Sequence, residues 1–219
     1  NVFALTTVAP IYPLYIRDEK GNIMYNSTTG LKSYDYGDGL INGVLRPYIQ
    51  QANPLCSNQL DTNESEGNSV NAIGFAEVRF LKDFKFTSTN SVSSEETRYT
   101  TTTNPWFGQY ASQNGAITVE HDRTWSYNYQ QLLTWHHQFD LHEVDAMLGH
   151  EYYRRRYYVL YGDKTNMYTF PSNDMASAVN TGSTNSYRND YNTEGWFGRV
   201  QYNYDQKYFA SLSYRRDAS

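Results

Sequence analysis

The stretch from residue 193 to residue 217 is the feature that most constrains how this 219-residue chain can fold. Apolar and polar side chains alternate on both sides of a short break at Asp205-Gln206, and one face carries Trp196, Gly198, Val200, Tyr202, Tyr204, Tyr208, Ala210, Leu212 and Tyr214. A period of two predicts two β-strands joined by a tight turn. The rings lie at the two ends of this face, with smaller side chains between them. That arrangement is typical of strands that cross a bilayer, because amphipathic rings settle at the two interfaces.

The same pattern recurs upstream. Alternation over residues 72–86, 125–139 and 144–152 is interrupted by tight turns near residues 82 and 141, each two to four residues long. Longer polar segments near 98–117 and 162–190 separate the hairpins and are expected to be loops. Short turns on one side and long loops on the other are typical of bacterial outer-membrane barrels. The sequence therefore predicts an all-β chain, an antiparallel transmembrane β-barrel segment with long extracellular loops.

The first 70 residues are less periodic. An apolar run at 11–16, a turn at 17–21 and a second run at 22–25 predict one small hairpin, and the polar residues 57–69 are expected to form a loop. We therefore divide the chain into residues 1–70, an extracellular loop region with short hairpins, and residues 71–219, consecutive transmembrane hairpins.

Composition excludes several classes of protein. No run of about 18 apolar residues occurs, so membrane-spanning helices are not expected. The chain has 22 Tyr, 10 Phe and 4 Trp, and its net charge of −5 argues against nucleic acid as a partner. The single cysteine, Cys56, allows neither a disulfide within these residues nor a zinc-binding cysteine spacing.

Residue spacing points to neither a metal site nor a catalytic site. His136 and His137 are adjacent on a predicted strand, so they point to opposite faces and cannot bind one ion together. The segment from Asp61 to Ala72 begins like a calcium-binding loop but has Glu66 where glycine is required, and it lacks the final glutamate. No nucleophile–base set or phosphate-binding glycine loop is found, so we expect no enzyme activity and no cofactor.

Three stretches carry a resemblance to a known family. NAIGFAEVRFLKDFKF (residues 71–86) and GRVQYNYDQKYFASLSYRRD (residues 198–217) resemble characteristic hairpins of the SusC/RagA-type TonB-dependent transporters of Bacteroidetes. APIYPLYIRD (residues 9–18), followed by YDYGDG (residues 34–39), is similar to an extracellular loop of that family. The resemblance implies a 22-stranded outer-membrane barrel with an N-terminal plug, energised by TonB and capped by a SusD-like surface lipoprotein. No plug or TonB-contacting segment is recognised among these residues, so we expect them to be a middle portion of the barrel of a longer chain.

Two functions remain open at this point. The first is TonB-dependent import of a nutrient, a glycan fragment or a peptide, across the outer membrane. The alternative is a soluble all-β carbohydrate-binding or adhesin module whose aromatic side chains would line a glycan site. The spacing of the aromatic residues and the asymmetry between turns and loops favour the transporter.

Possible contact residues follow from this interpretation. Trp106 and Tyr110 lie in a predicted outer loop, where they either stack on a substrate or pack within the loop. Arg154 and Arg156 would face outward at the level of lipopolysaccharide phosphates, while Arg155 would face the lumen and an anionic substrate or an acidic neighbour. The alternative for all three arginines is an ordinary solvated strand end. The side chains expected to face lipid are Phe80, Phe84, Phe86, Leu133, Trp135, Leu148, Val200 and Leu212.

Overall fold

The computed structural model describes residues 8, 10–39, 43–47 and 53–219. The elements in chain order are helix α2 (Pro54–Leu60), strands β1 (Thr62–Phe80) and β2 (Phe84–Thr103), 3-10 helix η1 (Ala111–Gln113), strands β3 (Ala116–Phe139) and β4 (His142–Met167), 3-10 helix η2 (Met175–Ser177), and strands β5 (Ala178–Tyr204) and β6 (Tyr208–Ala218). No helix among the described residues has the length and apolar character needed to cross a membrane.

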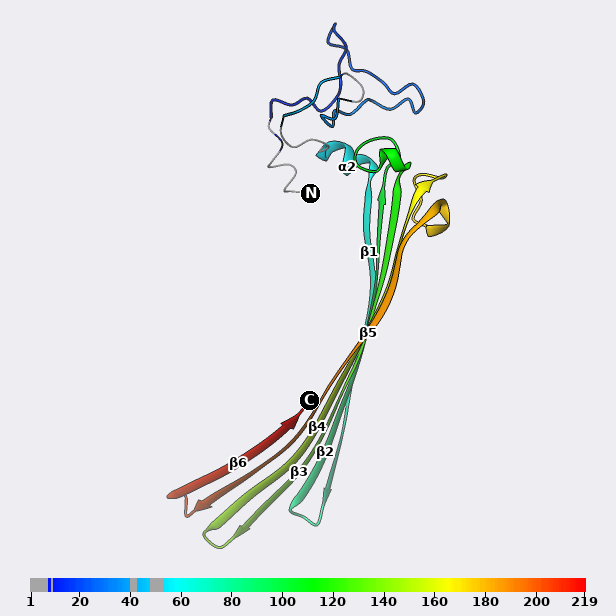
Figure 1. The fold of residues 1–219 in the computed structure, drawn as a ribbon. Helices are drawn as coiled ribbons and strands as arrows, with labels where there is room; N and C mark the ends of the chain where they lie inside the picture. The colour runs from blue at the N-terminus through cyan, green and yellow to red at the C-terminus, as the bar shows by residue number, and fades with distance from the viewer. Residues whose placement is uncertain (1–7, 9, 40–42, 48–52) are drawn as a thin grey trace. The chain divides into compact units, whose positions relative to one another are not determined.

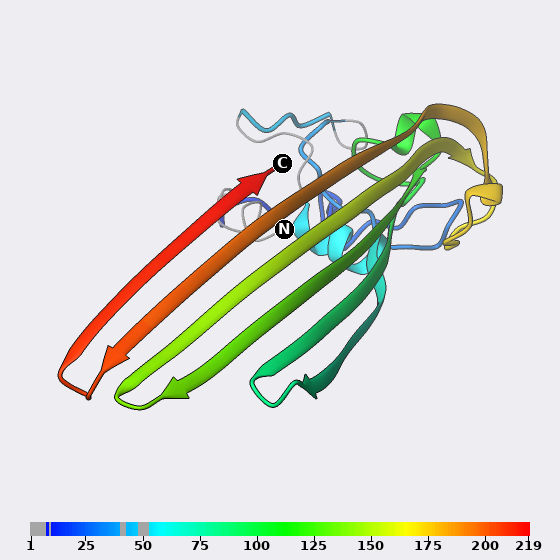
Figure 2. The ribbon, with the colours of Figure 1, turned by 90° about the horizontal axis from the view of Figure 1, so that it is seen from below.

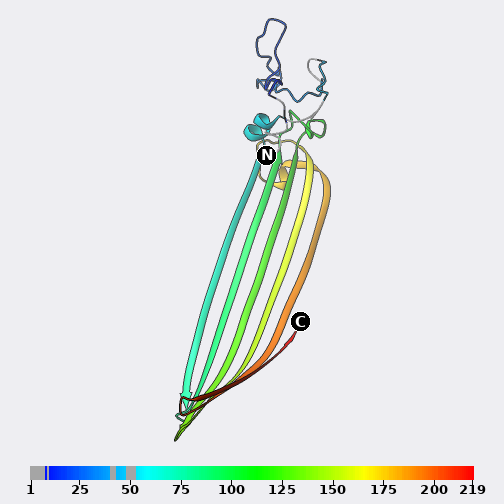
Figure 3. The same cartoon turned by 90° about the vertical axis from the view of Figure 1, so that its left-hand side faces the viewer.

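The six strands form one sheet in the order β1-β2-β3-β4-β5-β6, so every strand pairs with its neighbour in sequence (Figure 1). Figure 3 shows β1 to β5 running side by side along the sheet. The three tight turns, at 81–83, 140–141 and 205–207, lie at the same end of the strands (Figure 2). Each contains a residue with positive φ, such as Lys82 at 63°, Asp140 at 54° and Gln206 at 55°. The predicted all-β antiparallel fold is confirmed, and the sheet is not closed by these six strands.

The register of β5 and β6 places the alternating residues opposite one another. Val200 pairs with Leu212, and Tyr204 pairs with Tyr208 beside the turn. Directly opposed residues of an antiparallel pair project from the same face of the sheet. The apolar positions of the two strands therefore form one continuous face, as their alternation predicts.

The strands extend further than predicted. The segment 98–117, expected to be a loop, contains the end of β2 and the beginning of β3, so the connection covers only residues 104–115. The segment 162–190 likewise contains the end of β4 and the beginning of β5, and its connection covers residues 168–177. These strand ends are rich in Ser, Thr and Asn and carry no extended apolar alternation. Among their few apolar residues, Ile117, Met167 and Ala178 pack together in a small buried cluster.

The polar segment 57–69 is also not a loop, which corrects the prediction made for it. Its first residues complete helix α2, and the remainder forms the beginning of β1. The helix starts at a side-chain cap, because the side chain of Asn53 accepts a hydrogen bond from the Cys56 amide and Pro54 occupies the first turn. Asp61 follows the helix and accepts hydrogen bonds from the backbone and side-chain amides of Asn104 at 2.9 and 2.7 Å.

The small N-terminal hairpin is present where it was predicted. Arg17 and Ile23 form an antiparallel bridge, and Tyr15 bridges to Tyr34. Asp18 organises the turn, because one of its carboxylate oxygens accepts hydrogen bonds from the Lys20 and Asn22 amides at 2.9 and 2.8 Å. The hydrogen bond that the Asn22 side chain donates to Asp18 at 3.0 Å, together with those from the Asn22 and Lys20 amides, holds the pKa of Asp18 below its usual value.

The chain divides into two compact units. The loop unit comprises residues 1–66, 98–120 and 161–185, and the sheet unit comprises residues 67–97, 121–160 and 186–219. The loop unit has a small core of Tyr34, Tyr36, Cys56 and Phe107. Beside this core, the buried guanidinium of Arg46 donates to the carbonyl of Asp35 at 2.7 Å and lies 3.4 Å from its carboxylate. The loop unit therefore carries its own packed interior.

Candidate functional site

One face of the sheet unit, which we call the aromatic face, carries a row of ring contacts beside the three tight turns. The row crosses all six strands, and neighbouring ring centroids lie 5.0–6.3 Å apart. Its members, the turn-side band, are Phe80, Phe84, Trp135, His137, Phe139, His142, Tyr204 and Tyr208. The alternation along each strand places these rings on one face, and the tight turns place the rings of neighbouring strands side by side.

A second row of rings, the far band, lies on the same face further along the strands. Tyr127 contacts Tyr152 at 5.8 Å, Tyr129 contacts His150 at 6.0 Å, and His150 contacts Trp196 at 4.3 Å. On β4, these rings stand eight to ten positions beyond His142 of the turn-side band. At about 3.4 Å per residue and a tilt of about 45°, eight to ten residues rise about 19–24 Å, close to the apolar band of a membrane barrel.

Aliphatic side chains occupy the aromatic face between the two bands. Leu148, Val200 and Leu212 line one shallow hollow there and are 53%, 48% and 76% exposed. Each of these residues lies an even number of positions from the rings on its own strand and therefore projects from the same face. These three residues, which were predicted to face lipid, thus share the aromatic face. An apolar surface of this kind is unusual on a protein that meets only water.

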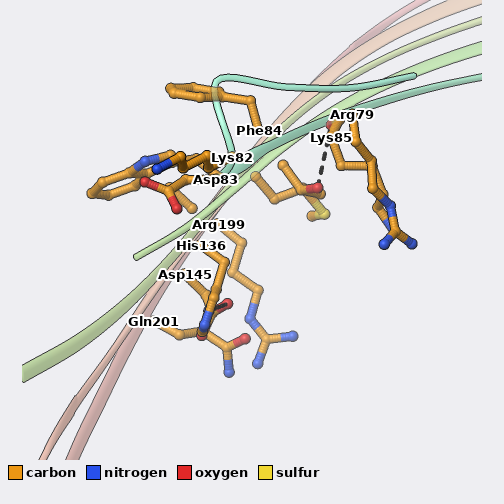
Figure 4. A pocket seen from close by; sticks show the side chains of 13 residues that line it. Arg79, Lys82, Asp83, Phe84, Lys85, His136, Asp145, Arg199 and Gln201 are labelled. Atoms are coloured by element: carbon orange, nitrogen blue, oxygen red, sulfur yellow. Dashed lines mark hydrogen bonds and ion pairs between the residues drawn. The ribbon is translucent and has the colours of Figure 1, made fainter. Parts of the chain in front are cut away.

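The opposite face, which we call the polar face, is lined by charged groups. Arg79 and Lys85 lie 3.0 and 3.6 Å from the carboxylate of Glu77, and Arg215 lies 3.4 Å from that of Glu151. An open hollow of about 470 Å³ lies beside the turns, and its lining includes Arg79, Lys85, Thr134, His136, Asp145, Arg199 and Gln201. Figure 4 shows Asp145, Arg199 and Gln201 gathered near His136.

Within the described residues, one group of side chains on the polar face has the donor set of a metal site. The ligand atoms of His136, Glu143 and Asp145 all lie within 4.8 Å of one another. His136 Nδ1 is hydrogen-bonded to Asp145 at 2.8 Å, and Glu143 accepts from the side chain of Asn203 at 2.9 Å. An ion would therefore have to compete with two existing hydrogen bonds. The prediction of no metal rests on histidine spacing and on the calcium-like segment 61–72, and neither pairs His136 with the acids across the turn.

The arginine triplet of β4 is divided between the two faces. The guanidinium groups of Arg154 and Arg156 both approach the carboxylate of Asp190 on β5, at 3.2 and 3.6 Å. Arg155 is exposed, and its guanidinium lies 5.7 Å from the centre of the Tyr157 ring. The three arginines therefore do not form one site.

The two aromatic loop residues are both half-buried. Trp106 is half-buried, contacts Phe170 edge to face at 5.2 Å and packs against the core of the loop unit. Tyr110 is also half-buried and precedes η1, where its carbonyl accepts from the amides of Gln113 and Gly115. The ring of Trp106 thus packs within the loop unit, while the contacts of Tyr110 are made by its backbone; contact of either ring with a substrate stays a prediction.

Sequence reasoning missed two arginines that lie with Arg154 and Arg156. Arg123 on β3 and Arg188 on β5 line the same hollow as Arg154 and Arg156. Arg188 lies in a segment that was predicted to be a loop, so no face was assigned to it. A strand predicted to begin at residue 178 would have placed Arg188 on the same face as Trp196 and Val200, because even numbers of residues separate them.

Comparison with known proteins identifies the architecture. No protein-family model matches the chain. The chain is 24% identical over 169 residues to TonB-dependent receptor P3 of Formosa agariphila, covering 76% of this chain and 17% of that protein. Solved structures of the RagAB peptide transporter, and of the RagAB peptide importer in its open-open and closed-closed states, match with TM-scores of 0.69, 0.68 and 0.67.

These structures are 17–18% identical to the chain; the matches cover 90–91% of this chain and 21% of theirs. The chain thus spans about a fifth of the length of the proteins that it matches. TonB-dependent receptors are outer-membrane transport proteins rather than enzymes, in agreement with the prediction from sequence. The chain is distantly similar in sequence to a TonB-dependent receptor and has the fold of one part of a RagA-type outer-membrane barrel.

Proposed function

We propose that this chain forms part of the barrel wall of a TonB-dependent transporter that imports a nutrient, a peptide or a glycan fragment, across the bacterial outer membrane. The observation that carries the proposal is the pair of ring bands on one face of the sheet, separated by the rise of one membrane-crossing strand. The distant similarity to a TonB-dependent receptor supports the same assignment.

In this proposal, the aromatic face meets lipid and the polar face lines the lumen. Rings of Tyr, Trp and Phe suit the two interfaces, and Leu148, Val200 and Leu212 suit the hydrocarbon between them. Charged groups such as Arg79, Lys85 and Arg215 suit a water-filled lumen, where they remain solvated. The two open edges of the sheet, β1 and β6, would pair with further strands of the barrel.

The identity of the nutrient is best tested by measuring its uptake in the native bacterium. Deleting the gene for the complete protein should abolish growth on its substrate, and a plasmid copy should restore it. Short peptides form the first panel, because the RagAB structures of the same fold are of a peptide importer, and oligosaccharides form the second. Growth on free amino acids and monosaccharides is the control. Uptake that continues unchanged when TonB is depleted would contradict the proposal.

A SusD-like surface lipoprotein is the proposed partner of the complete protein. Affinity purification of the tagged protein from detergent-solubilised outer membranes should recover such a lipoprotein in a fixed ratio. The matched control is an unrelated outer-membrane barrel of the same strain carrying the same tag. Recovery of the lipoprotein with both barrels would argue against a specific complex.

A further inference from the structure

Four arginines converge on the aromatic face beyond the far band. Arg123 of β3, Arg154 and Arg156 of β4 and Arg188 of β5 line one open hollow of about 680 Å³. Trp125, Tyr127 and Tyr158 complete its lining. The hollow therefore draws on three neighbouring strands and combines guanidinium groups with amphipathic rings.

Positive charge in this arginine cluster exceeds negative charge by three. Asp190 is the one carboxylate within 4 Å of any of the four guanidinium groups among the described residues, and Arg154 and Arg156 share it. Arg123 lies over the ring of Trp125 at 5.9 Å, and neither Arg123 nor Arg188 has an ion pair within the described part of the chain. The nearby acid Glu96 is paired with His121 at 2.7 Å. Four like charges on one small surface repel one another, and an anion in the hollow would relieve that repulsion.

The height of the cluster along the strands matches a membrane surface. Arg154 stands twelve positions beyond His142, where β4 begins, and Arg123 and Arg188 stand sixteen positions from the turn-side ends of their strands. At about 3.4 Å per residue and a tilt of about 45°, twelve residues rise about 29 Å, a few ångströms above the apolar band of about 25 Å. Arg154, the arginine of the cluster nearest the turns, thus lies at the level of the headgroup phosphates. That level is on the side of the membrane away from the tight turns.

We propose that this arginine cluster is a binding site for the phosphate groups of lipopolysaccharide in the outer leaflet. The inference rests on the proposed function, because it requires the aromatic face to meet lipid. Arginine suits the task, since its planar fork holds phosphate oxygens through two parallel hydrogen bonds. The rings of Trp125, Tyr127 and Tyr158 would lie beside the sugar–acyl boundary of the lipid. An anionic substrate in transit would instead meet Arg155 on the polar face.

The test measures lipid A retained by the complete protein purified from outer membranes in mild detergent. We expect the combined variant Arg123→Gln, Arg156→Gln and Arg188→Gln to retain roughly tenfold less lipid A per barrel, because several charge-assisted hydrogen bonds are lost together. Arg154 is kept so that Asp190 is not left without a partner. The matched control is Arg155→Gln, which removes one arginine of the same strand from the opposite face and should retain as much lipid A as the unaltered protein.

A second experiment distinguishes binding of the whole lipid from binding of phosphate alone. The purified barrel is stripped of lipid and titrated with lipid A, with phosphatidylglycerol or with inorganic phosphate. Saturable binding of lipid A that the combined variant lacks would support the proposal. Equal binding of all three ligands would assign the hollow to phosphate in general and overturn the assignment to lipopolysaccharide. Equal lipid A retention by the combined variant and the unaltered protein would overturn the site itself.

Assembly is measured alongside, so that the two proposals can fail separately. The combined variant should reach the outer membrane in normal amount, and if it does not, the single variants Arg123→Gln and Arg188→Gln are compared, each expected to lower retention several-fold. Single variants that assemble and retain lipid A fully would overturn the site. An unaltered protein found outside the outer membrane would overturn the proposed function instead.

Discussion

The loop unit buries apolar side chains in a core, whereas the sheet unit exposes apolar side chains on one face. In the loop unit, Tyr36 and Cys56 are 5% and 0% exposed and pack into a common core. In the sheet unit, Val200 and Leu212 are 48% and 76% exposed, although the two residues are paired across β5 and β6. The comparison shows that the loop unit supplies its own apolar surroundings, whereas the sheet depends on surroundings that lie outside the chain. A bilayer meets that need.

The largest expected difference concerns the reactivity of Cys56. Burial raises the pKa of the Cys56 thiol to about 12. Because the thiolate is the reactive form, its fraction at pH 8 should be on the order of a thousandfold lower than for an ordinary thiol. Alkylation by iodoacetamide in the complete protein, followed by mass spectrometry of the peptide that contains Cys56, measures the rate. The same peptide in denaturant is the control, and a native rate within tenfold of it would show that the loop core is open.

The next effect concerns the packing of the loop core. Tyr36→Ala removes a buried ring beside Cys56 and should destabilise the loop unit by about 3–5 kcal/mol. The barrel should still assemble, because the sheet unit does not use this core. Faster alkylation of Cys56 and faster trypsin cleavage after Arg17 and Lys20, at an unchanged barrel yield, would confirm that the two units are stabilised separately.

Tyr25→Ala is the matched control for that variant, because Tyr25 lies in the same unit and is exposed. It should leave both rates unchanged. Loss of the barrel in Tyr36→Ala would contradict the separation of the units.

A smaller effect is expected on the lipid side of the sheet. An arginine that faces lipid at the bilayer midplane costs about 2–4 kcal/mol of folding free energy, whereas an arginine that faces the lumen is tolerated. Leu212→Arg should therefore lower the yield of assembled barrel, measured by heat-modifiable migration of the complete protein. Ser211→Arg, on the adjacent residue of the opposite face, should assemble normally. Equal yields from the two variants would reject our assignment of the faces.

The smallest effect is confined to the N-terminal turn and depends on pH. The hydrogen bonds from the Asn22 side chain and from the Asn22 and Lys20 amides lower the pKa of Asp18 in the folded turn. A lowered folded-state pKa means that this stabilisation is present above the unfolded value and is lost as the pH falls through the folded value. Amide hydrogen exchange at Lys20 and Asn22 should therefore lose protection below about pH 4, the ordinary range of an aspartate.

Asp18→Ala should remove that pH dependence, whereas Glu19→Ala, which changes the next residue of the same turn, should keep it. Protection that is unchanged down to pH 2 in the unaltered protein would show that the carboxylate does not hold the turn.

The sequence was sufficient to predict the hairpins wherever one face is apolar. Alternation at 125–139 and 196–214 located strands, and the short polar breaks at 140–141 and 205–206 located turns, because a period of two on a half-buried strand leaves few alternatives. The same alternation assigned Phe84, Trp135 and Leu212 to one face. These features depend only on local sequence.

Only the tertiary structure decided where the strands end and which charged groups meet. The polar residues 178–193 carry no apolar alternation, and they become a strand because the end of β4 offers them a backbone ladder to pair with. Helix α2 was missed although Asn53-Pro54 is a recognisable helix start. Arg123 and Arg188 are 65 positions apart in sequence, and the order β3-β4-β5 places them around one hollow. Register between strands is a long-range property, so residues that lie at the same height on different strands are brought together by pairing and not by local pattern.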